Sequence, residues 1–234
     1  SANLRVDGYD MQFTWKSKIH KLSYTIGFNL SGRKPAMITK ANNPNKLLSG
    51  YYIGERLNEI WGYVTQGYFT EADFVKGTLD GNLQNGTLLP GIAPFQGVRQ
   101  NPGDIRFVDI NRDSIINAGN NTVSDPGDRK IIGNSTRRLQ YGINGSLSYA
   151  NLDLSFFIQG IDDRDVWISN QVFWPYLDQF AGIFKHQLDY WTPDNTTAYY
   201  PRLYANASGN TGTSRNVQTK YLSNGAYLRL KSIG

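Results

Sequence analysis

An Asp- and Asn-rich stretch at 109–117, DINRDSIIN, has the residue types and spacing that bind a hard metal ion. Counted from its first residue, side-chain oxygens recur at positions 1, 3, 5 and 9, and a main-chain carbonyl falls at position 7, as in calcium-binding loops. Several oxygens that converge on one point are what Ca²⁺ prefers, so the stretch predicts a structural Ca²⁺ site. The predicted ligands are Asp109, Asn111, Asp113, Ile115 through its carbonyl, and Asn117.

Two departures from the calcium-loop pattern concern the turn and the closing ligand. Position 6, where a glycine normally makes the sharp turn, is Ser114, and position 12 is Asn120 in place of a bidentate Glu. Asp125 or Asp128 is expected to close the site from beyond the inserted NNTVSDPG. The alternative is an Asx-rich turn, in which the same side chains accept hydrogen bonds from nearby amides without a metal.

Residues that could catalyse a reaction are poorly arranged. The two histidines have no motif around them, and the chain has no cysteine. Asp162, Asp163 and Asp165 form a charged turn, whereas a glycoside hydrolase needs two carboxylates about 5–10 Å apart across a cleft. No GxSxG elbow, phosphate-binding loop or dinucleotide fingerprint is present. We therefore expect no enzymatic activity.

Aromatic residues, with 15 Tyr, 11 Phe and 5 Trp, offer a second kind of candidate site. Exposed aromatics stack on sugar rings and are enriched at protein interfaces. A substrate- or partner-facing role is therefore considered for Trp61, Tyr63, Trp167 and Trp174. The alternative is that these side chains form the cores of the loops that carry them.

Two stretches alternate apolar and polar residues with a period of two, which indicates strands with one apolar face. A strand pair is predicted at 9–30 and a second hairpin at 138–160, each with a short connection. Each arm has about 9–11 residues, the length of a tilted strand that crosses a bilayer. In a membrane, the apolar face would contact lipid and the polar face would line a wet lumen. The alternative is a secreted, soluble β-sandwich binding module with a structural Ca²⁺ site, its apolar face buried in a core.

Long excursions stand beside these short turns. They comprise a loop region at 31–137 and a second at 161–226, followed by a strand at 227–233. The second region carries a predicted helix at 171–191, interrupted at Pro175. Compact soluble domains rarely combine such loops with such turns, but outer-membrane barrels do. The sequence therefore favours an all-β fold: antiparallel strands from an incomplete transmembrane barrel, with long extracellular loops and a short loop helix.

Composition excludes some classes of protein and leaves others open. No run approaches 18 apolar residues, which excludes a transmembrane helix. The net charge of +5 is mild and the basic residues are scattered, so no nucleic-acid partner is expected. The first residues carry no signal peptide, and the strand-like AYLRLKSI reaches the end of the sequence. We expect the chain to be part of a longer protein.

Several motifs, in one order, carry a resemblance to a known family. They are GDIRFVDINRDSIIN, then DRKIIGNSTRRLQYGINGSLSYANLDLSFFIQG, then YWTPDNTTAYYPRL, then YLRLKSI. Together they resemble the C-terminal part of SusC/RagA-like TonB-dependent outer-membrane receptors. The chain departs from the family pattern at Ser114, where a Gly is usual, and at Arg137 or Arg138, where the IG-x-x-x-P step usually has Pro.

The resemblance implies an importer in the outer membrane of a Gram-negative bacterium. Members of the family are 22-stranded barrels plugged by an N-terminal domain and energised through TonB. A SusD-like lipoprotein caps them outside and helps to capture oligosaccharides or peptides. The resemblance covers nearly the whole chain and implies a barrel portion without the plug or the TonB-contacting segment. We expect such a portion to be unstable outside the full protein, because its sheet edges are unpaired.

Overall fold

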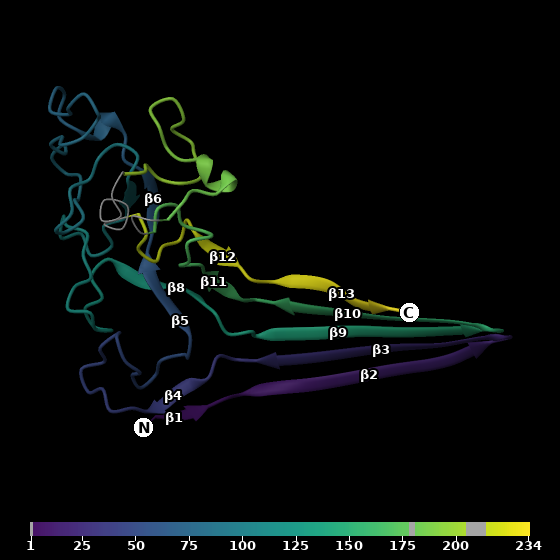
Figure 1. The fold of residues 1–234 in the computed structure, drawn as a ribbon. Coiled ribbons are helices and arrows are strands. Elements are labelled where there is room, and N and C mark those ends of the chain that lie inside the picture. The colour runs from purple at the N-terminus through teal and green to yellow at the C-terminus, as the bar shows by residue number, and fades with distance from the viewer. Residues whose placement is uncertain (1, 178–180, 205–213) are drawn as a thin grey trace.

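The computed structural model describes residues 2–177, 181–204 and 214–234. Its largest element is a five-stranded antiparallel sheet in the order β13-β10-β9-β3-β2 (Figure 1). The strands are β2 (Gly8–Ile19), β3 (Leu22–Arg33), β9 (Leu139–Tyr149), β10 (Leu152–Asp162) and β13 (Tyr227–Ile233). Both predicted hairpins are present, and their strands extend past the predicted ends to Arg33 and Asp162.

The two hairpin turns lie at the same end of the sheet. Leu22 pairs with Tyr149, so the turn after Ile19 and the turn before Leu152 stand side by side. Each turn holds one non-glycine residue in the left-handed region, His20 at φ 55° and Ala150 at φ 54°. The remaining connections of the sheet leave from the opposite end (Figure 1).

Cross-strand register joins the apolar positions into continuous rows. One row crosses all five strands through Phe13, Phe28, Ile143, Ile158 and Leu230. The rows run from Ile19, Leu22, Tyr149 and Leu152 at the turns to Tyr9, Gly32 and Leu139 at the loop end. We call this face the apolar belt.

The apolar belt is open in the described part of the chain. Phe13 is 59% exposed, Trp15 54% and Leu230 60%, so no described element packs on this face. The β-sandwich alternative requires the same face to be buried in a core, and it is therefore wrong for this structure. An uncovered apolar face of this width calls for an apolar environment outside the chain.

Glycines in the belt are covered by aromatic rings from neighbouring strands. A Cβ at Gly145 would lie 2.3 Å from the Phe156 ring, and a Cβ at Gly160 would lie 2.2 Å from the Tyr141 ring. Gly32 is covered in the same way by Tyr9, at 2.4 Å. These rings therefore lie against the sheet, because glycine leaves space for them.

The connections and the first residues fold together at the loop end of the sheet, and we call the described residues of 2–7, 34–137 and 163–226 the loop lobe. Its secondary-structure elements are short. They are two 3-10 turns and the two-stranded sheets β1-β4, β5-β8, β6-β7 and β11-β12. The bounds are β1 (Asn3–Arg5), β4 (Met37–Lys40), β5 (Glu59–Tyr63), β6 (Thr65–Tyr68), η1 (Glu71–Asp73), β7 (Ile105–Phe107), β8 (Arg129–Asn134), β11 (Asp165–Trp167), η2 (Lys185–Leu188) and β12 (Leu222–Asn224).

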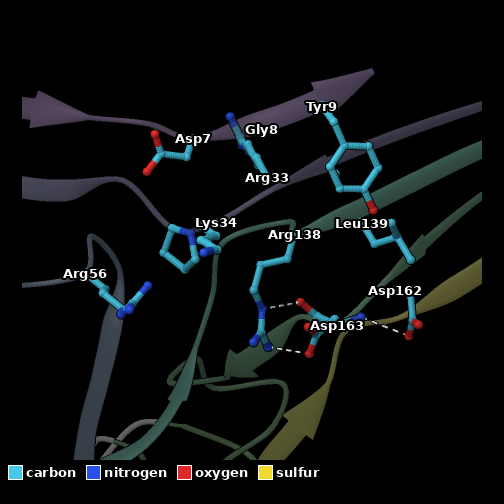
Figure 2. Close-up of a pocket in the computed structure, with 12 residues that line it drawn as sticks. Asp7, Gly8, Tyr9, Arg33, Lys34, Arg56, Arg138, Leu139, Asp162 and Asp163 are labelled. Atoms are coloured by element: carbon cyan, nitrogen blue, oxygen red, sulfur yellow. Dashed lines mark hydrogen bonds and ion pairs between the residues drawn. The ribbon is translucent and has the colours of Figure 1, made fainter. Parts of the chain in front are cut away.

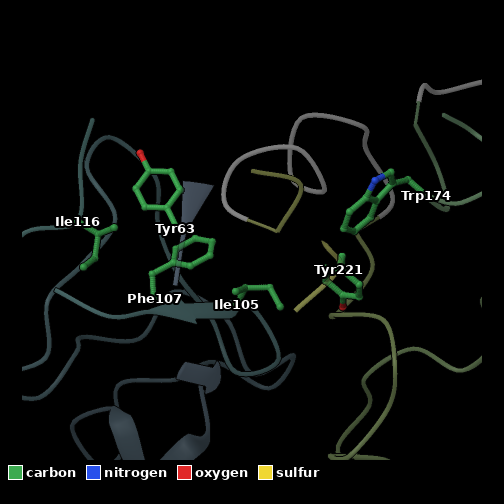
Figure 3. Packing of buried hydrophobic residues seen from close by; sticks show 6 residues of the cluster. All are labelled: Tyr63, Ile105, Phe107, Ile116, Trp174 and Tyr221. Carbon is green, nitrogen blue, oxygen red and sulfur yellow. The ribbon is translucent and has the colours of Figure 1, made fainter. Parts of the chain in front are cut away.

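A hydrophobic core holds the lobe together (Figure 3). It is drawn from segments far apart in the sequence and contains Tyr63, Ile105, Phe107, Ile116, Trp174 and Tyr221. Aromatic pairs dominate it: the Tyr63 and Phe107 rings are 4.9 Å apart and the Trp174 and Tyr221 rings 4.8 Å apart. The long loops are thus a packed body with its own core.

The predicted helix at 171–191 is wrong for the described residues. Residues 171–177 form turns, and the helical part is the 3-10 turn η2. Pro175 cannot continue an α-helix, and Tyr176 at φ 49° turns the chain away. Trp174 is buried in the lobe core, so tertiary packing decides the local backbone. No helix in the described ranges is long and apolar enough to cross a membrane.

Candidate functional sites

The face opposite the apolar belt is polar and built of small side chains. It carries Gln12, Thr25, Asn29, Asn144 and Ser146, among others. Asn144 lies over Gly27, where a Cβ would be 2.4 Å from its Oδ1, and Asn29 lies over Gly142 at 2.7 Å. The sheet therefore separates an apolar surface from a polar one.

Three carboxylates of the Asp-rich stretch converge. Asp109, Asp113 and Asp128 each offer one oxygen, and these atoms lie within 4.8 Å of one another. Asp128 is fully buried, Asp109 half-buried and Asp113 exposed. Of the two residues expected to close the site, Asp128 is the one in place, because Asp125 instead accepts hydrogen bonds from Asn120 N and Nδ2 at 3.1 and 2.7 Å.

The stretch makes its sharp turn without the usual glycine. Ser114 itself adopts φ 69° and Arg112 φ 63°, both in the left-handed region. Asp109 fixes this conformation: its Oδ1 accepts Arg112 N at 2.6 Å and its Oδ2 accepts Ser114 N at 2.9 Å. Asp113 Oδ1 accepts Ile115 N at 2.9 Å. The Asx-turn alternative therefore accounts for these hydrogen bonds, but it does not explain why three carboxylates converge.

The remaining predicted ligands hold the loop itself. Asn111 Nδ2 donates to Asp113 Oδ2 at 2.9 Å, and Asn117 Oδ1 accepts Gly119 N at 2.6 Å. Asp128 accepts Ile110 N and Asn117 N, at 2.8 and 2.9 Å. Burial raises the pKa of the Asp128 carboxyl, with the main-chain donors acting in the opposite direction. The donor set is made of hard oxygens with three carboxylates, which fits Ca²⁺.

The aromatic candidates divide into buried and half-buried residues. Tyr63 is 5% exposed and Trp174 2%, so a substrate- or partner-facing role is wrong for these two. Both belong to the lobe core, as the alternative predicted, because a large ring stabilises most when it is removed from water. Trp61 and Trp167 are half-buried, and the Trp167 ring packs on Trp174 at 5.8 Å.

Three of the segments behind the family resemblance meet in one place. Gly103 has φ 90°, and a Cβ there would lie 2.3 Å from Cε3 of Trp191. The Gly103 carbonyl accepts Arg202 N at 2.9 Å, and the Arg202 guanidinium lies over the Trp191 ring at 6.0 Å. The GD, WTP and PRL segments, far apart in the sequence, therefore form one contact.

Sequence reasoning assigned no role to Asp104, which completes this contact. It is 3% exposed and accepts Asn101 N at 2.8 Å and the Tyr204 hydroxyl at 2.9 Å. Burial raises the pKa of Asp104 to about 7, against the opposite effect of these donors and of Arg202. The signal available was its place in GDIRF, directly after a turn glycine.

Comparison with known proteins supports the resemblance seen in the sequence motifs. No family model matches the chain. TonB-dependent receptor P26 of Formosa agariphila is 32% identical over 134 residues, covering 56% of the chain and 12% of that protein. TonB-dependent receptor P3 of the same organism is 24% identical over 99% of the chain and 21% of its own length. The chain is similar to parts of two TonB-dependent receptors.

Solved structures show a similar fold. The RagAB peptide transporter matches 98% of the chain with a TM-score of 0.61 at 16% identity. The RagAB peptide importer in its open-open state matches 99% with a TM-score of 0.59 at 17% identity. The chain spans about a fifth of the length of these structures and of the receptor P3.

The resemblance found in the sequence is thus confirmed, as is the all-β class with antiparallel strands of an incomplete barrel. The curated relatives are named TonB-dependent receptors, which agrees with the expectation that this chain is not an enzyme.

Proposed function

We propose that the chain forms part of the barrel wall and the extracellular loops of an outer-membrane nutrient transporter energised through TonB. The observation that carries this is the five-stranded sheet with one apolar and one polar face, short turns at one end and a packed lobe at the other (Figure 1). Barrel strands in the outer membrane expose apolar residues to lipid, turn polar residues to the lumen and place long loops outside the cell.

The dimensions of the apolar belt support a membrane position. Ile19 and Tyr9 mark its two ends on β2. Their separation along the strand is about 33 Å at the usual rise per residue. With the usual barrel tilt, this gives about 25 Å along the membrane normal, which equals the height of the apolar band of such barrels.

We propose further that a SusD-like lipoprotein binds the lobe from outside and that the cargo is an oligosaccharide or a peptide. The neighbour of similar fold is named a peptide transporter, which supports a peptide. A lobe with its own aromatic core would present a rigid surface to such a partner.

We propose that Ca²⁺ is a structural ligand of the lobe, held by Asp109, Asp113 and Asp128. A divalent cation would offset three carboxylates that converge within 4.8 Å, one of them fully buried. Replacing Asp128 by Asn should abolish Ca²⁺ binding by calorimetry and make the loop sensitive to protease. Asp125→Asn is the matched control and should retain binding. Equal Ca²⁺ affinity in both variants would refute the site.

The proposed function is tested by extracting the parent protein from its native membrane in mild detergent. Mass spectrometry then identifies what accompanies it. A SusD-like lipoprotein in stoichiometric amount is the expected result. Recovery of the parent protein in the soluble fraction, alone, would overturn both the membrane position and the partner.

A further inference from the structure

A charged pocket of about 730 Å³ lies at the loop end of the sheet (Figure 2). Tyr9 and Leu139, which belong to the last row of the apolar belt, form part of its lining. Just beyond that row stand three basic residues, Arg33, Lys34 and Arg56. The pocket is therefore the place where the apolar belt ends and basic side chains begin.

Some charges of the pocket are already paired. Arg138 Nη2 lies 2.5 Å from Asp163 Oδ1, and Arg138 Nε donates to the Asp163 carbonyl at 2.9 Å (Figure 2). Asp7 pairs with Arg5, outside the lining, at 3.3 Å. These carboxylates are thus compensated without the three basic residues named above.

The other basic groups of the pocket form no ion pair with a carboxylate among the described residues. Within the described residues, neither the Lys34 nor the Arg56 side chain has an ion pair or a hydrogen bond, and both are exposed. Arg33 gives only its Nε to the Arg137 carbonyl at 3.3 Å. Against these three cations stands the carboxylate of Asp162, which accepts Asp163 N at 2.9 Å. The uncompensated charge of the pocket is positive.

The position of the pocket along the membrane normal follows from the length of the apolar belt. With the turns on the periplasmic side, the row of Tyr9 and Leu139 lies about 25 Å above them, at the outer interface. Basic residues at this level attract the phosphates of anionic lipids.

On the basis of the proposed membrane function, we propose that this pocket binds the phosphorylated headgroup of an outer-leaflet lipid. Lys34 and Arg56 contact the phosphate, and Tyr9 and Leu139 contact the apolar part of the same molecule. The occupant is a lipid because the basic and apolar groups line one pocket, in the order in which a headgroup and its acyl chains follow each other across the interface.

The experiment uses the full-length receptor in detergent and measures binding of diphosphorylated lipid A, dephosphorylated lipid A and inorganic phosphate. The variant K34Q/R56Q removes the two basic groups that have no side-chain partner, so the fold should be retained. At about fivefold per basic residue, it should bind the diphosphorylated lipid about 25- to 30-fold more weakly. K76Q/K185Q, an equal change of charge at exposed lobe positions, should bind like the unaltered receptor.

Each contrary result has a distinct meaning. Unchanged affinity in K34Q/R56Q, in a receptor that still shows heat-modifiable mobility as a folded barrel, overturns the lipid site and leaves the transporter function standing. Inorganic phosphate that competes as well as the phosphorylated lipid overturns the lipid assignment. A parent protein that forms no heat-modifiable barrel in membranes overturns the proposed function itself.

Discussion

Replacing Ile143 by lysine places a charge near the middle of the apolar belt. Ile143 lies in the row of Phe13 and Phe28, four residues from the loop end of β9 and six from its turn. At the usual strand rise and barrel tilt, the charge would be about 10 Å below the outer interface. A lysine near the midplane costs about 2–4 kcal/mol, which lowers the folding equilibrium constant about 30- to 900-fold.

The assay is urea titration of the full-length protein in lipid vesicles, with folding followed by heat-modifiable gel mobility. Ser146→Lys, on the polar face three residues away, should unfold at the urea concentration of the unaltered receptor. Tyr149→Lys, at the turn, should cost no more than about 1 kcal/mol, because the penalty falls towards the interface. Equal midpoints for I143K and S146K would refute the assignment of the two faces.

Three further predictions concern the loop lobe in the full-length protein. Gly103→Ala should destabilise the lobe by about 1–3 kcal/mol more than Gly54→Ala, as measured by hydrogen exchange. Both glycines have φ near 90°, but only at Gly103 would the added methyl group meet Trp191. Equal effects of the two substitutions would contradict this packing. Ser114→Gly should slow exchange in its loop by relieving about 0.5–1 kcal/mol of left-handed strain, and unchanged exchange would contradict that strain. Burial raises the pKa of Asp104 from 3.8 to about 7. The contribution of this carboxyl to lobe stability is therefore complete below pH 4 and is lost as pH rises through 7, by up to roughly 4 kcal/mol. The protease resistance of the lobe should fall accordingly with rising pH, and Asp104→Asn should flatten this dependence.

The strands could be predicted from the sequence because a period of two is a local property. Phe13 and Ile143 show their common face through their immediate neighbours, and the register then places them in one row. The same holds for Asp109 and Asp113, whose spacing brings their carboxylates together. Local spacing in the sequence was sufficient to predict the structure wherever the structure repeats over a few residues.

The lobe could not be predicted in the same way, because contacts between distant segments decide its conformation. Trp174 lies in an apparently helical stripe, yet its ring packs on Tyr221, 47 residues later in the chain by number. Asp128 and Asp125 were equivalent candidates in sequence, and only the three-dimensional loop brings Asp128 to the cluster. Burial of a particular ring or carboxylate depends on partners that no short window of sequence contains.

The rings that cover glycines in the apolar belt have a consequence for how this wall can evolve. Gly145 and Phe156 occupy one volume, as do Gly160 and Tyr141. A methyl group added to the glycine would push the ring outward among the acyl chains, and a smaller residue in place of the ring would leave a groove in the wall. Each pair should therefore vary as a unit, and related proteins that lack one member should also lack the other.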